Sequence, residues 1–127
     1  DNGITIEVDD FPESINTLGR LKFDGYSTGT IASVGDVDWF KVSLLQGQQV
    51  QFDLEGNPTS KGTLGDPYIR GIYSSVGVLI GHTNDDGGVD TNSRVTYTVV
   101  TTGDYYIAAG AYDSSVGSYS LLATLLP

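Results

Sequence analysis

Gly35-Asp36-Val37-Asp38-Trp39-Phe40-Lys41-Val42 is the stretch that decides the fold. A turn with two carboxylates leads directly into an alternating strand that holds the only tryptophan of the chain. Asp36 and Asp38 lie two residues apart, so their side chains share one face if the strand has already begun. Two hard oxygen donors on one face, beside a turn that can add carbonyls, favour Ca²⁺.

The composition indicates a single all-β domain. The chain has 127 residues, of which 39% are hydrophobic, and a chain of this length buries about two thirds of the surface that it exposes when unfolded. It contains 17 glycines and 8 tyrosines, and many Ser and Thr. Such a mixture is typical of short strands joined by tight turns. Without an internal repeat or a dividing linker, residues 1–127 are predicted to form one domain, with an acidic arm and a short helical turn over 1–19 and a sandwich over 20–127.

The charge balance disfavours two classes of partner. Six basic residues stand against 16 acidic ones, which gives a formal net charge of −10. This field repels nucleic-acid phosphates and anionic membranes, and it attracts divalent cations. The absence of Cys fits an exported bacterial protein that uses metal in place of disulfides, although a reducing cytosol also fits. No apolar run reaches membrane-spanning length and no signal peptide is present, so we expect no membrane insertion and interpret the start at Asp1 as a cut-out domain or a mature fragment.

Strand-like segments follow one another at regular spacing. The alternation is clearest over 40–44, 50–54 and 95–99, where every second residue is apolar and is expected to face a core. The predicted strands are Leu21–Phe23, Tyr26–Ala32, Val37–Leu44, Gln48–Glu55, Pro67–Tyr73, Val78–Thr83, Arg94–Thr101, Gly103–Ala111 and Ser118–Leu126. Phe11–Gly19 is the one helix-like piece, because Pro12 suits a first helical turn and Gly19 can end it. Eight or nine strands with polar turns predict an antiparallel β-sandwich of jelly-roll type.

The acidic residues form two candidate calcium sites. Calcium takes six to eight oxygens, which loops rich in Asp, Asn and Gly supply. The first set is Glu7, Asp9, Asp10, Asp36 and Asp38, and the second possible set is Asp66, Asp85, Asp86 and Asp90. The alternative is that Asp and Asn before Gly are ordinary turn residues, and on composition alone this explanation is preferred for any single loop.

Catalytic patterns are weak in this chain. Gly25-Tyr26-Ser27-Thr28-Gly29 matches the nucleophile-elbow string, but that elbow needs a following helix and here a β-branched strand follows. His82 is the only histidine and its neighbours indicate a surface turn. Nothing singles out two of the acids as a glycosidase pair. We therefore predict no enzymatic activity and no catalytic residue.

The tyrosines allow two interpretations. Sandwich cores use tyrosine with its hydroxyl at the rim, whereas an exposed set gives rigid contact area for sugars or peptides. Tyr105 and Tyr106 are adjacent, so they face opposite sides of their strand. The candidate ligand-binding residues are Tyr68, Tyr73, Tyr105 and Tyr112.

The order and spacing of several short motifs resemble the bacterial pre-peptidase C-terminal (PPC) domain family over almost the whole chain. The central Gly-Asp-x-Asp-Trp-Phe motif of that family is similar to residues 35–40, and its acidic opening to residues 7–10. The other matching pieces are Gly29-Thr30-Ile31, Gly47, Phe52, Leu54, Asp66-Pro67-Tyr68-Ile69, Asn84-Asp85-Asp86-Gly87-Gly88, Gly103-Asp104-Tyr105-Tyr106-Ile107 and Gly117-Ser118-Tyr119-Ser120-Leu121. Two departures are Ser74, where the family often has Asp, and Gly71, which replaces an apolar residue and leaves a groove or accommodates a bulky neighbour.

This resemblance implies a non-catalytic jelly-roll domain attached to a secreted peptidase, another hydrolase or an adhesin. Such domains assist secretion or stability or bind a substrate polymer, and the related collagen-binding domains of clostridial collagenases hold calcium at an acidic N-terminal segment. Carried over, it places Glu7, Asp9 and Asp10 around one Ca²⁺ with Asp36 and Asp38. The predicted partners are an extracellular polymer, either protein or polysaccharide, and the covalently linked parent protein. The alternative function is a calcium-dependent, lectin-like carbohydrate-binding module.

Overall fold

The computed structural model describes residues 11–81, 88 and 92–127, and within these ranges the chain forms eight β-strands and one 3₁₀-helix. The strands are β1 (Tyr26–Ile31), β2 (Asp38–Leu44), β3 (Gln49–Glu55), β4 (Pro67–Tyr73), β5 (Leu79–Gly81), β6 (Ser93–Thr98), β7 (Gly103–Ala111) and β8 (Gly117–Leu125). The 3₁₀-helix η1 (Asn57–Thr59) follows β3. In this described part, no helix combines the length and the apolarity that a membrane crossing requires.

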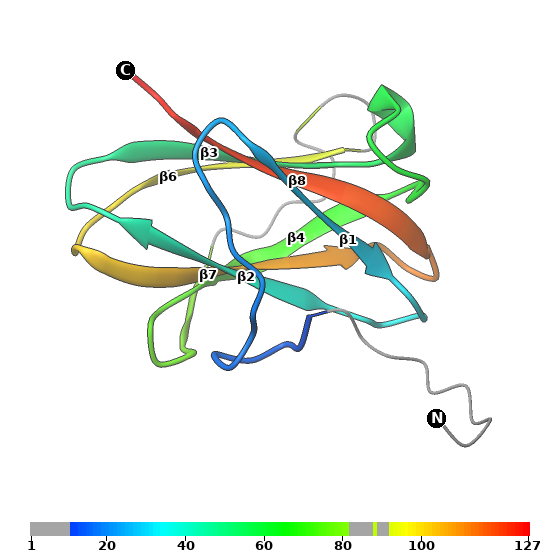
Figure 1. The fold of residues 1–127 in the computed structure, drawn as a ribbon, viewed down its shortest axis with the longest axis horizontal. Coiled ribbons are helices and arrows are strands. Elements are labelled where there is room, and N and C mark those ends of the chain that lie inside the picture. Colours follow the sequence, from blue (N-terminus) through cyan, green and yellow to red (C-terminus); the bar gives the residue numbers. More distant parts are fainter. Residues whose placement is uncertain (1–10, 82–87, 89–91) are drawn as a thin grey trace.

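The described strands form two antiparallel sheets that pack face to face (Figure 1). One sheet has the order β1-β8-β3-β6 and the other has the order β2-β7-β4-β5. The chain crosses repeatedly from one sheet to the other, so most neighbouring strands are far apart in sequence. This order is that of a jelly roll, which confirms the predicted all-β, antiparallel sandwich.

The core lies between the sheets and uses the predicted alternating residues. Phe40, Val42 and Leu44 on β2 are 1%, 3% and 1% exposed. The corresponding buried sets on the other sheet are Val50, Phe52 and Leu54 on β3, and Val95, Tyr97 and Val99 on and just after β6. Each fully buried large apolar side chain stabilises the fold by roughly 1.5–3 kcal/mol relative to an exposed one. The prediction that these alternating residues face the core is therefore confirmed.

Some predicted element bounds differ from the structure. β4 and β7 match the predicted ranges at both ends, whereas β2 starts at Asp38 and β6 ends at Thr98. The helical turn expected over residues 11–19 is reduced to one hydrogen-bonded turn, in which the Thr17 N–H donates to the Ser14 carbonyl at 3.2 Å. Ile15 and Leu18, the apolar residues of this turn, are 46% and 82% exposed. Without a buried apolar stripe, so short a helix gains no packing energy.

The segment predicted as a strand over Leu21–Phe23 instead links the two sheets. Its N-terminal end pairs with β2, where the Leu21 N–H donates to the Lys41 carbonyl at 2.9 Å. Its C-terminal end pairs with β8, where the Asp24 N–H donates to the Ala123 carbonyl, also at 2.9 Å. Leu21 is 7% exposed and closes the core at this side. The segment at residues 21–23 thus pairs with strands, but its backbone hydrogen bonds are divided between the two sheets.

Gly19 lets this segment approach β2 closely. A Cβ atom at residue 19 would lie 2.7 Å from the Trp39 carbonyl oxygen and 3.1 Å from the Phe40 ring. The Gly19 carbonyl also accepts the Lys41 N–H at 2.9 Å. A side chain here would push the segment away from the edge of β2, so glycine is required for the closure.

Trp39 packs on the outer face of its sheet, opposite to Phe40. Its ring stacks on Tyr73 at a centroid distance of 4.3 Å and lies 5.5 Å from the ring of Tyr106. Only 5% of Trp39 is exposed. The tryptophan therefore serves a second, smaller apolar cluster that includes Ala108.

The two departures from the PPC pattern have structural explanations. Gly71 has a φ of +146° and lies at a register shift between β4 and β7. A Cβ there would come within 2.6 Å of Leu79 Cδ1, so Gly71 accommodates this bulky neighbour on β5. Ser74 closes the turn between β4 and β5, where its N–H donates to the Val78 carbonyl at 2.8 Å.

Candidate functional site

Asp36 lies in the turn between β1 and β2 and is half-buried. Its Oδ2 accepts the Ala32 N–H at 3.1 Å, and its own N–H donates to the Ser33 carbonyl at 3.0 Å. Gly35, at φ +88°, provides the left-handed conformation that the turn requires. Asp36 therefore orders this turn and presents a carboxylate two residues before β2 begins.

Asp38 is the first residue of β2, and its side chain faces the core on the same side as Phe40. It is 0% exposed, and the hydroxyl of Tyr119 on β8 donates to Asp38 Oδ2 at 2.5 Å. Tyr119 is itself 1% exposed and packs edge-on against Phe40 at 6.1 Å. This charge-assisted hydrogen bond joins the two sheets through the core. Sequence reasoning missed this contact because its partners are 81 residues apart.

The carboxylates of Asp36 and Asp38 have the hard oxygen chemistry that Ca²⁺ prefers. The carboxylate of Asp36 lies in a half-buried turn, and the carboxylate of Asp38 lies on the core side of β2. The other predicted ligands, Glu7, Asp9 and Asp10, lie outside the described residues. Within residues 11–81, 88 and 92–127, no three Asp, Glu, His or Cys side chains gather closely enough to hold a metal. A site at this turn thus requires donors from elsewhere in the chain.

The second predicted metal set is described only at Asp66. This residue is half-buried before β4, and its carbonyl accepts the Tyr112 N–H at 3.0 Å. Asp85, Asp86 and Asp90 lie outside the described residues, as does His82. The backbone of Asp66 thereby ties the start of β4 to the end of β7.

Two of the four predicted tyrosines come together on the outer face of the β2-β7-β4-β5 sheet. The rings of Tyr68 and Tyr112 are 6.4 Å apart, and Tyr112 is 52% exposed. Arg70 lies over the Tyr68 ring at 4.5 Å, and its guanidinium donates to the Ala111 carbonyl at 2.9 Å. The result is an accessible aromatic pair beside a fixed cation.

The other two tyrosines are used in packing. Tyr73 stacks on Trp39, as described above. Tyr105 faces the core, where its ring is 5.8 Å from that of Tyr97 and its hydroxyl donates to the Thr101 carbonyl. The alternation rule correctly separated Tyr105 from its neighbour, but it did not indicate which of the two faces inward.

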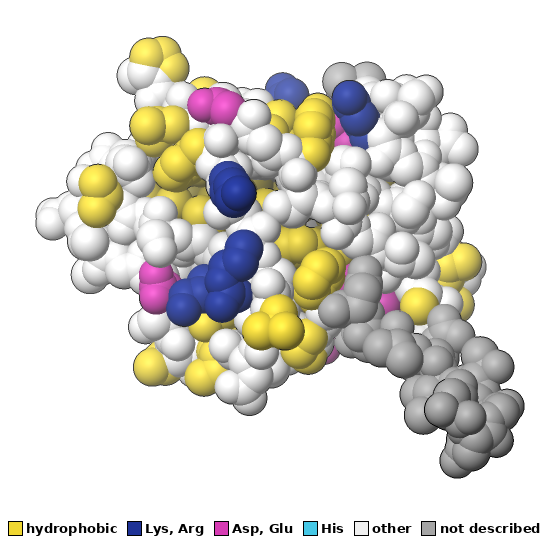
Figure 2. Space-filling model, in the orientation of Figure 1, with side chains coloured by type: hydrophobic (Ala, Val, Ile, Leu, Met, Phe, Trp, Pro, Cys, Tyr) yellow, Lys and Arg dark blue, Asp and Glu magenta, His cyan; other side chains and the backbone are white. Residues whose placement is uncertain are grey.

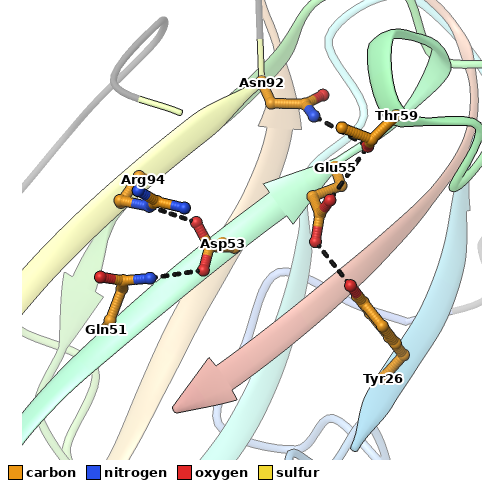
Figure 3. Close-up of polar contacts among 7 residues, drawn as sticks. All are labelled: Tyr26, Gln51, Asp53, Glu55, Thr59, Asn92 and Arg94. Atoms are coloured by element: carbon orange, nitrogen blue, oxygen red, sulfur yellow. Dashed lines mark hydrogen bonds and ion pairs between the residues drawn. The ribbon is translucent and has the colours of Figure 1, made fainter. Parts of the chain in front are cut away.

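The outer face of the other sheet carries a polar network that the sequence analysis did not identify (Figure 3). Arg94 on β6 lies directly opposite Asp53 on β3, and its Nε is 2.6 Å from Asp53 Oδ1. Glu55 accepts hydrogen bonds from Tyr26 and Thr59, both at 2.9 Å. Partial burial, together with the hydrogen bond to Glu55, raises the pKa of Tyr26. The acids Asp53 and Glu55 and the base Arg94 were visible in the sequence, but the pairing of Asp53 with Arg94 needed the register.

The fold and these contacts define the class of protein as a jelly-roll β-sandwich with structural polar clusters on both sheets. No protein-family profile matches the chain, and no curated protein matches it. Solved structures do share its fold.

The pre-peptidase C-terminal domain of a collagenase from Bacillus anthracis is 13% identical, with a TM-score of 0.59, and the match covers 84% of this chain and 93% of that one. PliG from Aeromonas hydrophila, a periplasmic inhibitor of g-type lysozyme, is 14% identical, with a TM-score of 0.56 and coverage of 85% and 95%. PliG from Salmonella Typhimurium is 17% identical, with a TM-score of 0.51 and coverage of 84% and 96%. At these identities the likeness is one of fold, and at that level it confirms the resemblance to PPC domains.

Proposed function

We propose that this chain is a non-catalytic accessory domain of an exported bacterial peptidase, other hydrolase or adhesin. The observation that carries this proposal is the structural use of the stretch over residues 35–42. Asp36 orders a turn, Asp38 joins the two sheets, and Trp39 is covered by tyrosines. The residues of this stretch thus serve to stabilise the fold. The fold likeness to a PPC domain of a collagenase and to periplasmic inhibitors supports an extracellular or periplasmic location.

Calcium is the second part of this proposal. A carboxylate at the Asp36 turn, a second at Asp38 and the acidic residues at 7–10 together supply the oxygen donors that the ion needs. In a chain with a net charge of −10, a divalent cation also relieves repulsion among these carboxylates. When bound, Ca²⁺ neutralises the cluster and stabilises the folded state by mass action, while Asp36 and Asp38 fix the site to the start of β2.

Calorimetric titration with CaCl₂ tests the site directly. We expect saturable binding to the wild type and at least tenfold weaker binding to Asp36→Asn. Asp24→Asn is the matched control, because Asp24 lies in a turn at the opposite end of β1 and has a φ of +62°, which Asn tolerates. The absence of binding heat in the wild type, or equal weakening in the two variants, contradicts the calcium site.

A lectin-like, calcium-dependent module is the second candidate function, and one observation favours it. The half-buried Tyr68 and the exposed Tyr112 form an aromatic pair with Arg70 fixed beside them, a combination that can stack on a sugar ring and donate to its hydroxyls. Affinity gel electrophoresis with a panel of polysaccharides tests it. Under this hypothesis, Tyr112→Ala and chelation both abolish retardation, whereas Tyr26→Ala, at a tyrosine 45% exposed on the other sheet, leaves it intact. Retardation that is equal in the two variants contradicts it.

A further inference from the structure

Half of the basic residues of this acidic chain line one groove. The sequence has six Lys and Arg. Three of them, Arg20, Lys22 and Lys41, lie around a groove of about 350 Å³, which we call the basic groove. Its complete lining is Arg20, Leu21, Lys22, Phe23, Lys41, Val42, Ser43 and Asp104. Figure 2 shows dark-blue side chains gathered beside a magenta one, where the N-terminal segment crosses β2 in Figure 1.

The other three basic side chains are each engaged elsewhere. Arg94 pairs with Asp53, Arg70 packs on Tyr68, and the Nζ of Lys61 lies 4.7 Å from the centre of the Tyr26 ring. Among the described residues, the basic groove is therefore the one place where several Lys and Arg side chains gather.

The groove forms where residues 21–23 part from β2. The segment pairs with β2 at Lys41 and then turns to β8, where Phe23 bridges to Ala123. Beyond Lys41, the outer edge of β2 is left without this cover. Ser43 is the next residue whose backbone points to that edge, because alternate residues of a strand direct their N–H and C=O groups to the same side. The divergence of the two segments thus opens the groove beside Ser43.

The backbone of Ser43 is an open position of the sheet edge. Lys41 directs its N–H to the Gly19 carbonyl and its carbonyl to the Leu21 N–H, away from β7. Because alternate residues of a strand point the same way, Ser43 directs its N–H and carbonyl to this same outer edge. Among the described backbone bonds outside the strand ladders, none involves Ser43. An N–H and a C=O on one residue at a sheet edge form the template for an added strand. The groove therefore offers backbone pairing as well as charge.

The groove has an excess of positive charge. Its one acid, Asp104, accepts the Ser43 hydroxyl at 2.7 Å and lies 3.4 Å from Lys41 Nζ. The hydrogen bond from Ser43 and the charges of Lys41 and Arg20 lower the pKa of Asp104. Lys22 is exposed and, in the part of the chain that the structure describes, makes no side-chain hydrogen bond or ion pair. Three cations against one carboxylate leave this groove positive on a negative protein.

We propose that the basic groove binds an extended acidic peptide. The peptide adds a short strand at Ser43 and places alternate Asp or Glu side chains against Lys22 and Lys41. The cations alone suit any polyanion, but the open N–H and C=O of one residue suit a peptide backbone. A volume of about 350 Å³ is at the small end of ligand pockets, so the bound segment is short. Repulsion from distant acidic residues is screened beyond about 8 Å at physiological salt, whereas the contact pairs are not. This binding is separate from the calcium site, so either proposal can fail alone.

Fluorescence polarisation with a labelled, end-blocked Thr-Glu-Thr-Glu-Thr peptide tests the charge component. We expect saturable binding that weakens with salt and that is weakened about tenfold by Lys22→Glu, because the reversal removes one attraction and adds one repulsion, each worth up to about fivefold. Lys61→Gln is the control for loss of a cation outside the groove, and we expect it to change the Kd less than twofold. A lack of binding, or equal effects of the two variants, overturns the proposal.

Ser43→Pro tests the backbone component. Proline removes the N–H that faces the open edge and leaves the bonds of β2 to β7 intact, so the variant is expected to fold. We expect it to weaken peptide binding about fivefold, the effect of one lost hydrogen bond. Ser43→Ala, which loses only the hydroxyl, is the matched control. If Ser43→Pro binds the peptide as tightly as Ser43→Ala does, the groove is not a peptide site. The same conclusion follows if polygalacturonate binds the wild type more tightly than the peptide does. Should Ser43→Pro fail to fold, the effect of Lys22→Glu on peptide binding decides the proposal.

Discussion

Replacement of Tyr119 by Phe tests the contact that joins the sheets. The hydroxyl donates to a carboxylate that is 0% exposed, and the tyrosine itself is 1% exposed. A hydrogen bond to a charged group contributes about 1.5–3 kcal/mol to stability, and its loss leaves Asp38 less well solvated in the core. At about 2.1 cal/mol/K of unfolding entropy per residue, a 127-residue domain should lose roughly 6–11 °C in Tm.

Urea unfolding, followed by the fluorescence of the single tryptophan, measures this loss as a free energy. Tyr106→Phe is the matched control, because its hydroxyl donates to a neutral carbonyl, that of Ile15, at 3.1 Å, and should cost only about 0.5–1.5 kcal/mol. A double-mutant cycle of Tyr119→Phe with Asp38→Ala isolates the pair, because alanine removes the acceptor, and we expect a coupling of about 1.5 kcal/mol or more. Additive effects within about 0.5 kcal/mol would refute the cross-sheet role of this pair.

Two further predictions concern a strained glycine and an acid in the basic groove. Gly71→Ala should destabilise the domain by about 1–3 kcal/mol, because the φ of +146° at residue 71 and the approach of Leu79 both oppose a Cβ atom. Urea unfolding measures this loss of stability. Adding Leu79→Ala to the Gly71→Ala variant should recover part of it. The pKa of Asp104 lies below its ordinary value of 3.8, lowered first by the hydrogen bond from Ser43 and then by Lys41. The ionised Asp104 therefore contributes stability above about pH 3.8, and this contribution is lost as the pH falls through the lowered pKa. NMR titration of the carboxyl carbon should show this lowered pKa and its rise in Ser43→Ala, and an unchanged value would contradict the contact.

Much of the fold could be predicted from the sequence because its strands alternate. A period of two fixes which side of a strand faces the core, and this decided Phe40, Val42 and Leu44 correctly. The same rule gives no information on where the backbone bonds of a short apolar segment go. Residues 21–23 have strand-like composition, but their bonds are divided between β2 and β8.

The candidate sites could be predicted less well because they depend on contacts across the sheets. Asp38 was predicted as a calcium ligand beside Asp36, and its contact with Tyr119, which is 81 residues away, could not be read from the sequence. Tyr68 and Tyr112 meet only because β4 and β7 are neighbours in the sheet. Pairing between distant strands is a property of the register, and no local pattern encodes it.

The central claim is that calcium, bound at Asp36 and Asp38 where β2 begins, stabilises an accessory domain. Thermal unfolding with and without calcium tests this claim most directly. A ligand that binds only the folded state stabilises it by about 2.7 kcal/mol at a free concentration 100 times its Kd, and this corresponds to a rise in Tm of roughly 10 °C for a domain of this size. We predict this rise in the wild type and in Asp24→Asn, and its loss in Asp36→Asn and after chelation. An equal Tm in calcium and in chelator for the wild type, or an undiminished rise in Asp36→Asn, contradicts the account.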